Sequence, residues 1–150
     1  MYGIIVEGKD VYFQGAKVYY TDLKLFLRAS GIDPLKYNWM IYQYECNYYP
    51  SEVLEKKRHS HIWLTGMEVN DLLANEHLQF IWGIIIGYTQ DVSKESVLQL
   101  KTPDYSKKPV SGVLNAIEIH AIDSTSTKIF SKNKKHIEQV KQSFPMANLI

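Results

Sequence analysis

Residues 39–49 read WMIYQYECNYY, and this stretch decides the fold that the sequence predicts. Its density of aromatic residues favours an extended strand. Alternate side chains of a strand point to the same face of the sheet. The side chains expected on one face are therefore Met40, Tyr42, Tyr44, Cys46 and Tyr48. Three tyrosines in a row suit a sheet surface that packs on a helix or stacks on a flat partner.

The residues around this strand predict a mixture of strands and helices. Further strands are expected over residues 2–7, 61–64, 78–88, 113–122 and 125–131. Helices are expected over residues 21–30, ended by Gly31, after the capping-box pattern Thr65–Glu68, and after a cap at Ser131 or Asn133. Residues 51–59 and 91–100 are expected to be short helices or irregular, and residues 101–111 a loop.

The stretch 78–88, LQFIWGIIIGY, predicts a central strand because it is apolar on both faces. Simple alternation places the following residues on one face: Leu78, Phe80, Trp82, Ile84, Ile86 and Tyr88. Gly83 and Gly87 lie on the other face, where they indicate a bulge or a close approach of another chain segment.

Composition and element order together predict one α+β domain over residues 1–150. With 45% hydrophobic and 22% charged residues, the chain has the composition of a globular protein. A chain of 150 residues buries about two-thirds of its unfolded surface, so it needs no disulfide or metal for stability. We expect a single mixed or mainly antiparallel sheet with about three helices packed mostly on one face.

The charge of the chain and its lack of targeting signals limit the classes of partner and the cellular compartment that we expect. The net charge is +1, and only two of the 17 basic residues, Arg28 and Arg58, are arginines, which argues against sequence-specific DNA reading. No apolar run is long enough for a membrane span, and the N-terminus lacks the pattern of a signal peptide. The one cysteine, Cys46, allows no internal disulfide. We therefore expect a cytoplasmic protein.

Two stretches resemble a family of uncharacterised small proteins of low-GC Gram-positive bacteria and their phages. The first comprises the helix at 21–30, the link GIDPLKYNW and the strand that follows. The second is IEIHAIDSTSTKIFSKNKKHIEQVKQSF, which has a strand, a turn at Asp123-Ser124, a strand and a helix. The resemblance implies an α+β fold and supplies no activity, cofactor or site residue.

Catalytic and metal-binding patterns are weak in this sequence. His59 and His61 would point to one side of a strand, and His120 with Glu118 could add ligands, but nothing in the spacing brings them together. Cys46 is interpreted as a buried packing residue, because no feature beside it would lower its thiol pKa. The carboxylates that could serve as acid or base are Glu45, Glu118 and Asp123, and solvated strand carboxylates are the simpler interpretation. The glycine-rich loops that hold phosphates are absent. We predict neither a metal nor a cofactor.

Ligand binding by stacking and charge is the chemistry that the sequence favours. The candidate site residues are Tyr42, Tyr44, Tyr48, Tyr49, Arg58, Lys101, Lys107 and Lys108. Tyrosine rings stack on bases and lysines neutralise phosphates. The alternative, favoured for Tyr42 and Tyr44, is that their rings cover a helix with hydroxyls at its rim. Tyr48 and Tyr49, close to Pro50, are expected to be exposed.

The function expected from the sequence is a non-catalytic binding protein. Our first hypothesis is sequestration of a small nucleotide-like ligand, as in a phage-type counter-defence protein, with a homodimer interface as one place for the site. The alternative is a protein-binding inhibitor or immunity protein that uses a tyrosine-rich surface, where such residues act as anchors. An enzyme ranks third, because it would need convergent titratable groups in a cleft.

Overall fold

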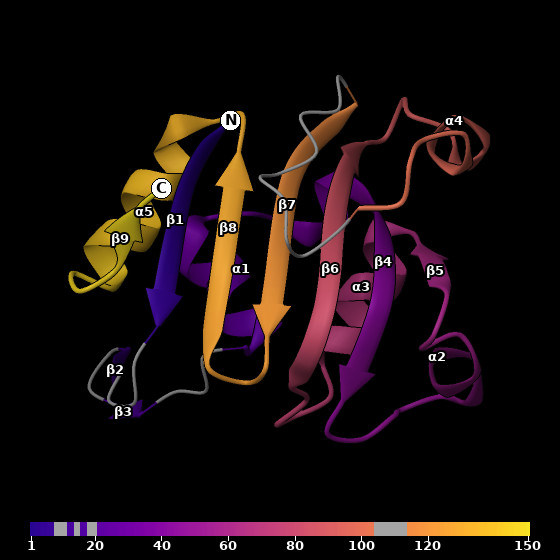
Figure 1. The fold of residues 1–150 in the computed structure, drawn as a ribbon, viewed down its shortest axis with the longest axis horizontal. Helices are drawn as coiled ribbons and strands as arrows, with labels where there is room; N and C mark the ends of the chain where they lie inside the picture. Colours follow the sequence, from indigo (N-terminus) through magenta and orange to yellow (C-terminus); the bar gives the residue numbers. More distant parts are fainter. Residues whose placement is uncertain (8–11, 14–15, 18–20, 104–113) are drawn as a thin grey trace.

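The computed structural model describes residues 1–7, 12–13, 16–17, 21–103 and 114–150, with backbone only at residues 12–13 and 16–17. Its centre is an antiparallel sheet (Figure 1). In spatial order the strands are β5 (His61–Leu64), β4 (Tyr37–Cys46), β6 (Phe80–Thr89), β7 (Asn115–Ile122), β8 (Ser126–Ser131), β1 (Tyr2–Glu7) and β9 (Asn148–Leu149). A separate pair is formed by β2 (Tyr12–Phe13) and β3 (Ala16–Lys17). The predicted α+β fold is confirmed, and the sheet is antiparallel throughout.

Helices cover one face of this sheet, which we call the helix-covered face. Figure 1 shows α1 and α3 behind the strands and α5 at the edge of the sheet, beside β1. In chain order the helices of the described residues are α1 (Leu23–Ser30), the 3-10 helix η1 (Pro34–Lys36), α2 (Glu52–Lys56), α3 (Gly66–Leu73), α4 (Lys94–Leu98) and α5 (Lys134–Ser143). None of them has both the length and the apolar content needed to cross a membrane.

Local signals set most of the helix ends as the sequence predicts. Thr65 and Glu68 form the reciprocal capping box of α3, with N–H to side-chain oxygen distances of 3.2 and 3.1 Å. Gly31 ends α1 in the left-handed conformation, with φ 66°. The start of α1 differs from the prediction, in which Thr21 caps a helix over residues 21–30, because Asp22 is the cap and its side chain accepts from the N–H of Leu25. Asn133 rather than Ser131 caps α5.

The sheet buries apolar side chains on both faces. On the helix-covered face, Trp39 and Ile41 of β4 and Ile85 of β6 join residues of α1, α3 and α5 in the main core. On the opposite face, a smaller cluster consists of Met40, Tyr42, Ile84, Ile86, Tyr88 and, from α4, Val97. The central position of β6, between β4 and β7, agrees with its apolar sequence.

The predicted alternation along β4 is wrong beyond Tyr42. Tyr42 pairs with Ile84, but the next partners are Glu45 and Trp82, so two residues of β4 oppose one of β6. This β-bulge includes Gln43, whose φ is 44°. A bulge shifts the alternation by one residue. Tyr42 therefore lies on the opposite face, whereas Tyr44 and Cys46 lie in the main core.

A second register shift, between the pairs Glu45–Trp82 and Cys46–Phe80, corrects the prediction for β6. Ile84, Ile86 and Tyr88 share the opposite face, but Leu78 and Phe80 lie in the main core. The prediction from the glycines is confirmed. A Cβ at Gly83 would lie 3.3 Å from Cβ of Tyr44, and a Cβ at Gly87 would lie 3.1 Å from the ring of Trp39. Gly83 thus leaves room for Tyr44 to turn into the core at the bulge.

Candidate functional site

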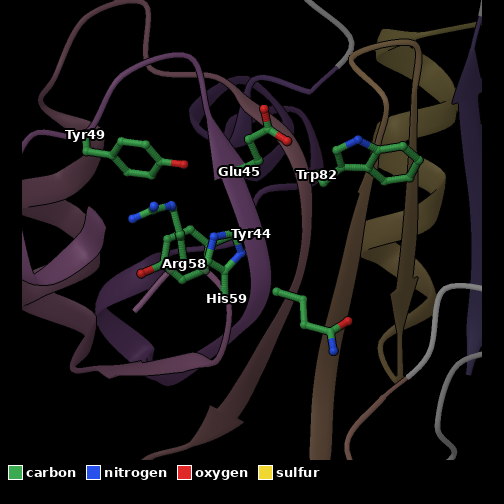
Figure 2. A pocket seen from close by; sticks show the side chains of 7 residues that line it. Tyr44, Glu45, Tyr49, Arg58, His59 and Trp82 are labelled. Atoms are coloured by element: carbon green, nitrogen blue, oxygen red, sulfur yellow. The ribbon is translucent and has the colours of Figure 1, made fainter. Parts of the chain in front are cut away.

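The bulge in β4 opens a pocket at one end of β4 and β6, and we call it the bulge pocket. Its volume is about 570 Å³, within the range of small-molecule sites. The residues that line it are Gln43, Tyr44, Glu45, Tyr49, Arg58, His59 and Trp82. They come from β4, from β6 and from the segments on either side of α2 (Figure 2).

Tyr44 anchors the wall of the bulge pocket to the core. Its ring packs edge-on against Phe80, with centroids 6.3 Å apart, and its hydroxyl donates a hydrogen bond to the carbonyl oxygen of Leu54 in α2. Burial raises the pKa of Tyr44 well above its ordinary value, and the nearby charge of Arg58 offsets only part of this. The hydroxyl thus stays protonated and holds α2 against the sheet.

Arg58 gives the pocket a positive charge, and the imidazole of His59 lines the pocket as well. Arg58 follows α2, and its guanidinium donates to the carbonyl oxygen of Glu55 at 2.7 Å. Among the residues that the structure describes, no carboxylate lies within ion-pair distance of Arg58 or of His59. Tyr49 lies at the same rim, and its hydroxyl accepts from the N–H of Cys46 at 3.3 Å. The arrangement suits an anionic group.

Glu45 and Trp82 form the other side of the pocket. They are direct partners in the register of β4 and β6, so their side chains are neighbours on the same face. Glu45 is exposed and Trp82 is half-buried. Figure 2 shows Glu45 between Trp82 on one side and Tyr49 with Arg58 on the other. A flat apolar surface, a hydrogen-bond acceptor and a cation therefore follow one another across the pocket.

The structure brings together three of the eight predicted site residues, Tyr44, Tyr49 and Arg58. Tyr42 is buried on the opposite face, where its hydroxyl hydrogen-bonds with Tyr88. Neither of the other two described candidates lines the pocket. The hydroxyl of Tyr48 donates to the carbonyl oxygen of Glu76 at 2.6 Å, and Lys101 is exposed beyond α4. Lys107 and Lys108 lie outside the described residues.

Sequence reasoning did not assign Gln43, Glu45, His59 and Trp82 to a ligand site. Glu45 and His59 were considered separately, as an acid–base candidate and a metal ligand. The signal that could have joined them is Gly83, because a glycine in a central strand marks the position that a bulge opposes. The register that follows from the bulge places Glu45 beside Trp82.

The three histidines considered for metal binding are separated. His61 of β5 and His120 of β7 lie in one row across the sheet, because His61 pairs with Tyr42, Tyr42 with Ile84, and Ile84 with His120. Three strand spacings of about 4.8 Å therefore separate His61 from His120. His59 lies in the bulge pocket. Within the described ranges, no three His, Cys, Asp or Glu side chains converge on a possible metal position.

Cys46 packs in the main core. Burial, and to a smaller extent the neighbouring Glu45 charge, raises the pKa of its thiol to about 12. Because the thiolate is the reactive form, this cysteine is a poor nucleophile at neutral pH.

A second polar group lies inside the molecule. Glu118 and His120 of β7 are 0% and 1% exposed, and Nε2 of His120 lies 2.6 Å from Oε1 of Glu118. The amide of Asn115 donates to Oε2 of Glu118 at 3.3 Å, and the ring of His120 packs edge-on against Phe130. The three polar side chains of this group are buried, and none of them lines the bulge pocket.

Comparisons with models of protein families, with curated proteins and with solved structures found no match to this chain. The functional argument therefore depends on the geometry of the bulge pocket.

Proposed function

We propose that this protein is a non-catalytic binding protein that holds a small, anionic, nucleotide-like ligand in the bulge pocket. The observation that carries the proposal is the pair of basic side chains, Arg58 and His59, which face the pocket without a carboxylate partner among the described residues. A guanidinium that is not already paired is available for a phosphate or carboxylate, which it binds in bidentate geometry.

Aromatic side chains supply the second part of the proposal. Trp82 and Tyr49 line the same pocket as Arg58. Stacking of a base on an aromatic side chain contributes about 1–3 kcal/mol and tolerates different bases. A pocket of about 570 Å³ has room for such a ring together with its anionic group. Sequestration in the cytoplasm, the role predicted from the sequence, needs no more than this binding.

Two groups near the pocket that could transform a ligand, the Cys46 thiol and the Tyr44 hydroxyl, are engaged in the fold. The thiol of Cys46 is buried with its pKa raised to about 12, and the hydroxyl of Tyr44 donates to Leu54. Glu45 and His59 are exposed, so water screens their effect on each other. These features support binding over catalysis.

The alternative, a protein-binding inhibitor with a tyrosine-rich surface, has less support. It requires the tyrosines of β4 on one accessible patch. Tyr42 and Tyr44 are instead buried on different faces of the sheet, and Tyr49 lines a concave pocket. The concavity favours a small ligand.

The first experiment is a thermal-shift screen of the whole chain against mononucleotides, ADP-ribose and cyclic dinucleotides. A ligand present at 100 times its dissociation constant adds about 2.7 kcal/mol to the free energy of unfolding. Titration calorimetry of any hit then compares wild type with Arg58→Ala. We expect the variant to bind about 10- to 100-fold more weakly, because a hydrogen bond to a charged group contributes about 1.5–3 kcal/mol.

Arg28→Ala is the matched control, because Arg28 is the other arginine and lies on α1, outside the bulge pocket. It should bind as wild type does. The melting temperature of Arg58→Ala is measured as well, since this variant also loses the hydrogen bond to Glu55. Equal affinity in the wild type and a folded Arg58→Ala variant would contradict the proposal, as would the absence of any shift in the screen.

A further inference from the structure

We propose that the bulge pocket selects a ligand whose ring carries two neighbouring N–H donors, as guanine does, and that Glu45 is the residue that reads them. This inference depends on the proposed function, because it names the class of ligand for the same site. It begins from the register of the sheet, which makes Glu45 and Trp82 direct partners across β4 and β6.

The pairing fixes where an acceptor lies relative to a stacking surface. Directly opposed side chains in an antiparallel pair have Cβ atoms about 4.5–5.5 Å apart. A ring that stacks on Trp82 therefore has the carboxylate of Glu45 at its edge. Figure 2 shows the Glu45 side chain reaching into the space beside Trp82. The two residues offer a face and an edge to the same flat ligand.

A carboxylate accepts hydrogen bonds and donates none, so it discriminates between bases. Guanine presents N1–H and an N2 amino group side by side, and both can donate to the two oxygens of Glu45. Adenine and cytosine present an amino group beside a ring nitrogen whose lone pair would face a carboxylate oxygen. Uracil presents one N–H between two carbonyl oxygens. Hypoxanthine has the ring N–H and lacks the amino group.

Charge orients such a ligand within the pocket. No basic side chain within the described ranges pairs with Glu45, so its charge faces the site. An anionic group is repelled by Glu45 and attracted by Arg58 on the other side of the pocket. The ring is therefore expected at Trp82 and Glu45, and the phosphate at Arg58.

The experiment is titration calorimetry of the whole chain with GMP, IMP and AMP, for wild type, Glu45→Gln and Glu52→Gln. Glu52 is the control, because it is an exposed carboxylate on α2 that does not line the pocket. We expect wild type to bind GMP about tenfold or more tightly than IMP or AMP, since a bidentate pair of hydrogen bonds discriminates by this factor. Glu52→Gln should keep that preference.

Glu45→Gln should reverse the preference. A glutamine amide can donate to N1 of adenine and accept from its amino group, so AMP should gain affinity while GMP loses about tenfold or more. Equal binding of the three nucleotides by wild type, or an unchanged GMP preference in Glu45→Gln, would overturn the inference and leave the proposed function standing. If the protein binds ADP-ribose but none of GMP, IMP and AMP, the inference is also overturned and the proposed function still stands. If no nucleotide of any kind binds, both proposals fail.

Discussion

The sheet carries two polar groups of similar composition and opposite character. Each has a glutamate and a histidine next to an aromatic ring. In the buried group, Glu118 and His120 lie 2.6 Å apart and are closed off from solvent. In the bulge pocket, Glu45 and His59 are exposed, and neither forms an ion pair with another described residue. The difference teaches that residue type alone does not mark a site. A buried polar group whose members bond to one another contributes to the fold, and a polar group that is open to solvent is available to a ligand.

Substitutions in the buried pair, Glu118 and His120, are expected to have the largest effect on stability and so test this comparison most directly. Replacing Glu118 or His120 with alanine should lower the free energy of unfolding by about 3–5 kcal/mol, because either change leaves the other group buried without its partner. Urea denaturation monitored by circular dichroism measures this loss. The folded fraction of each variant should still bind whatever ligand the wild type binds.

The matched control for the buried pair removes both partners. Glu118→Leu with His120→Phe replaces the pair by apolar groups and should recover most of the lost stability, since such replacements are often neutral or stabilising. If each single alanine variant loses less than about 1 kcal/mol, the pair is not a closed structural group. The comparison with the bulge pocket would then break down.

The next effect concerns the bulge that separates the two groups. Gln43 has φ 44°, a conformation that costs a β-branched residue more than it costs glycine. Gln43→Val should therefore be less stable than Gln43→Gly by about 1–2 kcal/mol, measured by urea denaturation of the two variants side by side. Gln43→Val should also weaken ligand binding, because it favours the regular strand that would remove the pocket. Equal stability of the two variants would mean that the bulge does not require this conformation.

The same bulge explains how far the sequence could predict the structure. The capping box of Thr65 and Glu68 and the glycine at position 31 act locally, so the helix ends follow from neighbouring residues. The antiparallel α+β class follows from the number and spacing of apolar strands. Gln43 gives no comparable signal, since glutamine is not a residue typical of positive φ. Its conformation depends on Gly83 and on the packing of Tyr44, which come together only in the folded sheet.

The candidate site shows the same limit. The bulge pocket lies at the aromatic stretch, but the predicted row of tyrosines assumes regular alternation through residue 48. One extra residue in β4 moves Tyr44 into the core and sets Glu45 opposite Trp82. The neighbours in the pocket thus depend on the register between β4 and β6, for which Gly83 is a hint within the sequence of β6 but does not identify the partner residues. Arg58 reaches the pocket because α2 packs beneath Tyr44, which is again a tertiary contact.

The smallest effect tests a histidine of intermediate burial, His136 of α5. Its Nδ1 lies 2.9 Å from Oγ of Ser131, and burial, followed by the nearby Lys135 charge, lowers the pKa of His136. The unfolded chain therefore takes up a proton at a higher pH than the folded chain does. The stability that His136 contributes is complete above its ordinary pKa of about 6.5 and is lost as the pH falls toward the lowered value.

Thermal melting at pH 7.5 and pH 5.0 should accordingly show a smaller loss on acidification for His136→Gln than for wild type. His59→Gln serves as the control, because His59 is exposed at the bulge pocket and should leave the wild-type response unchanged. A variant at His136 that loses as much stability as wild type would place this histidine with the exposed group. A smaller loss of stability in the His136 variant would place His136 between the buried group and the exposed group. This is the result expected if burial, rather than residue type, decides how a polar side chain of this protein responds to pH.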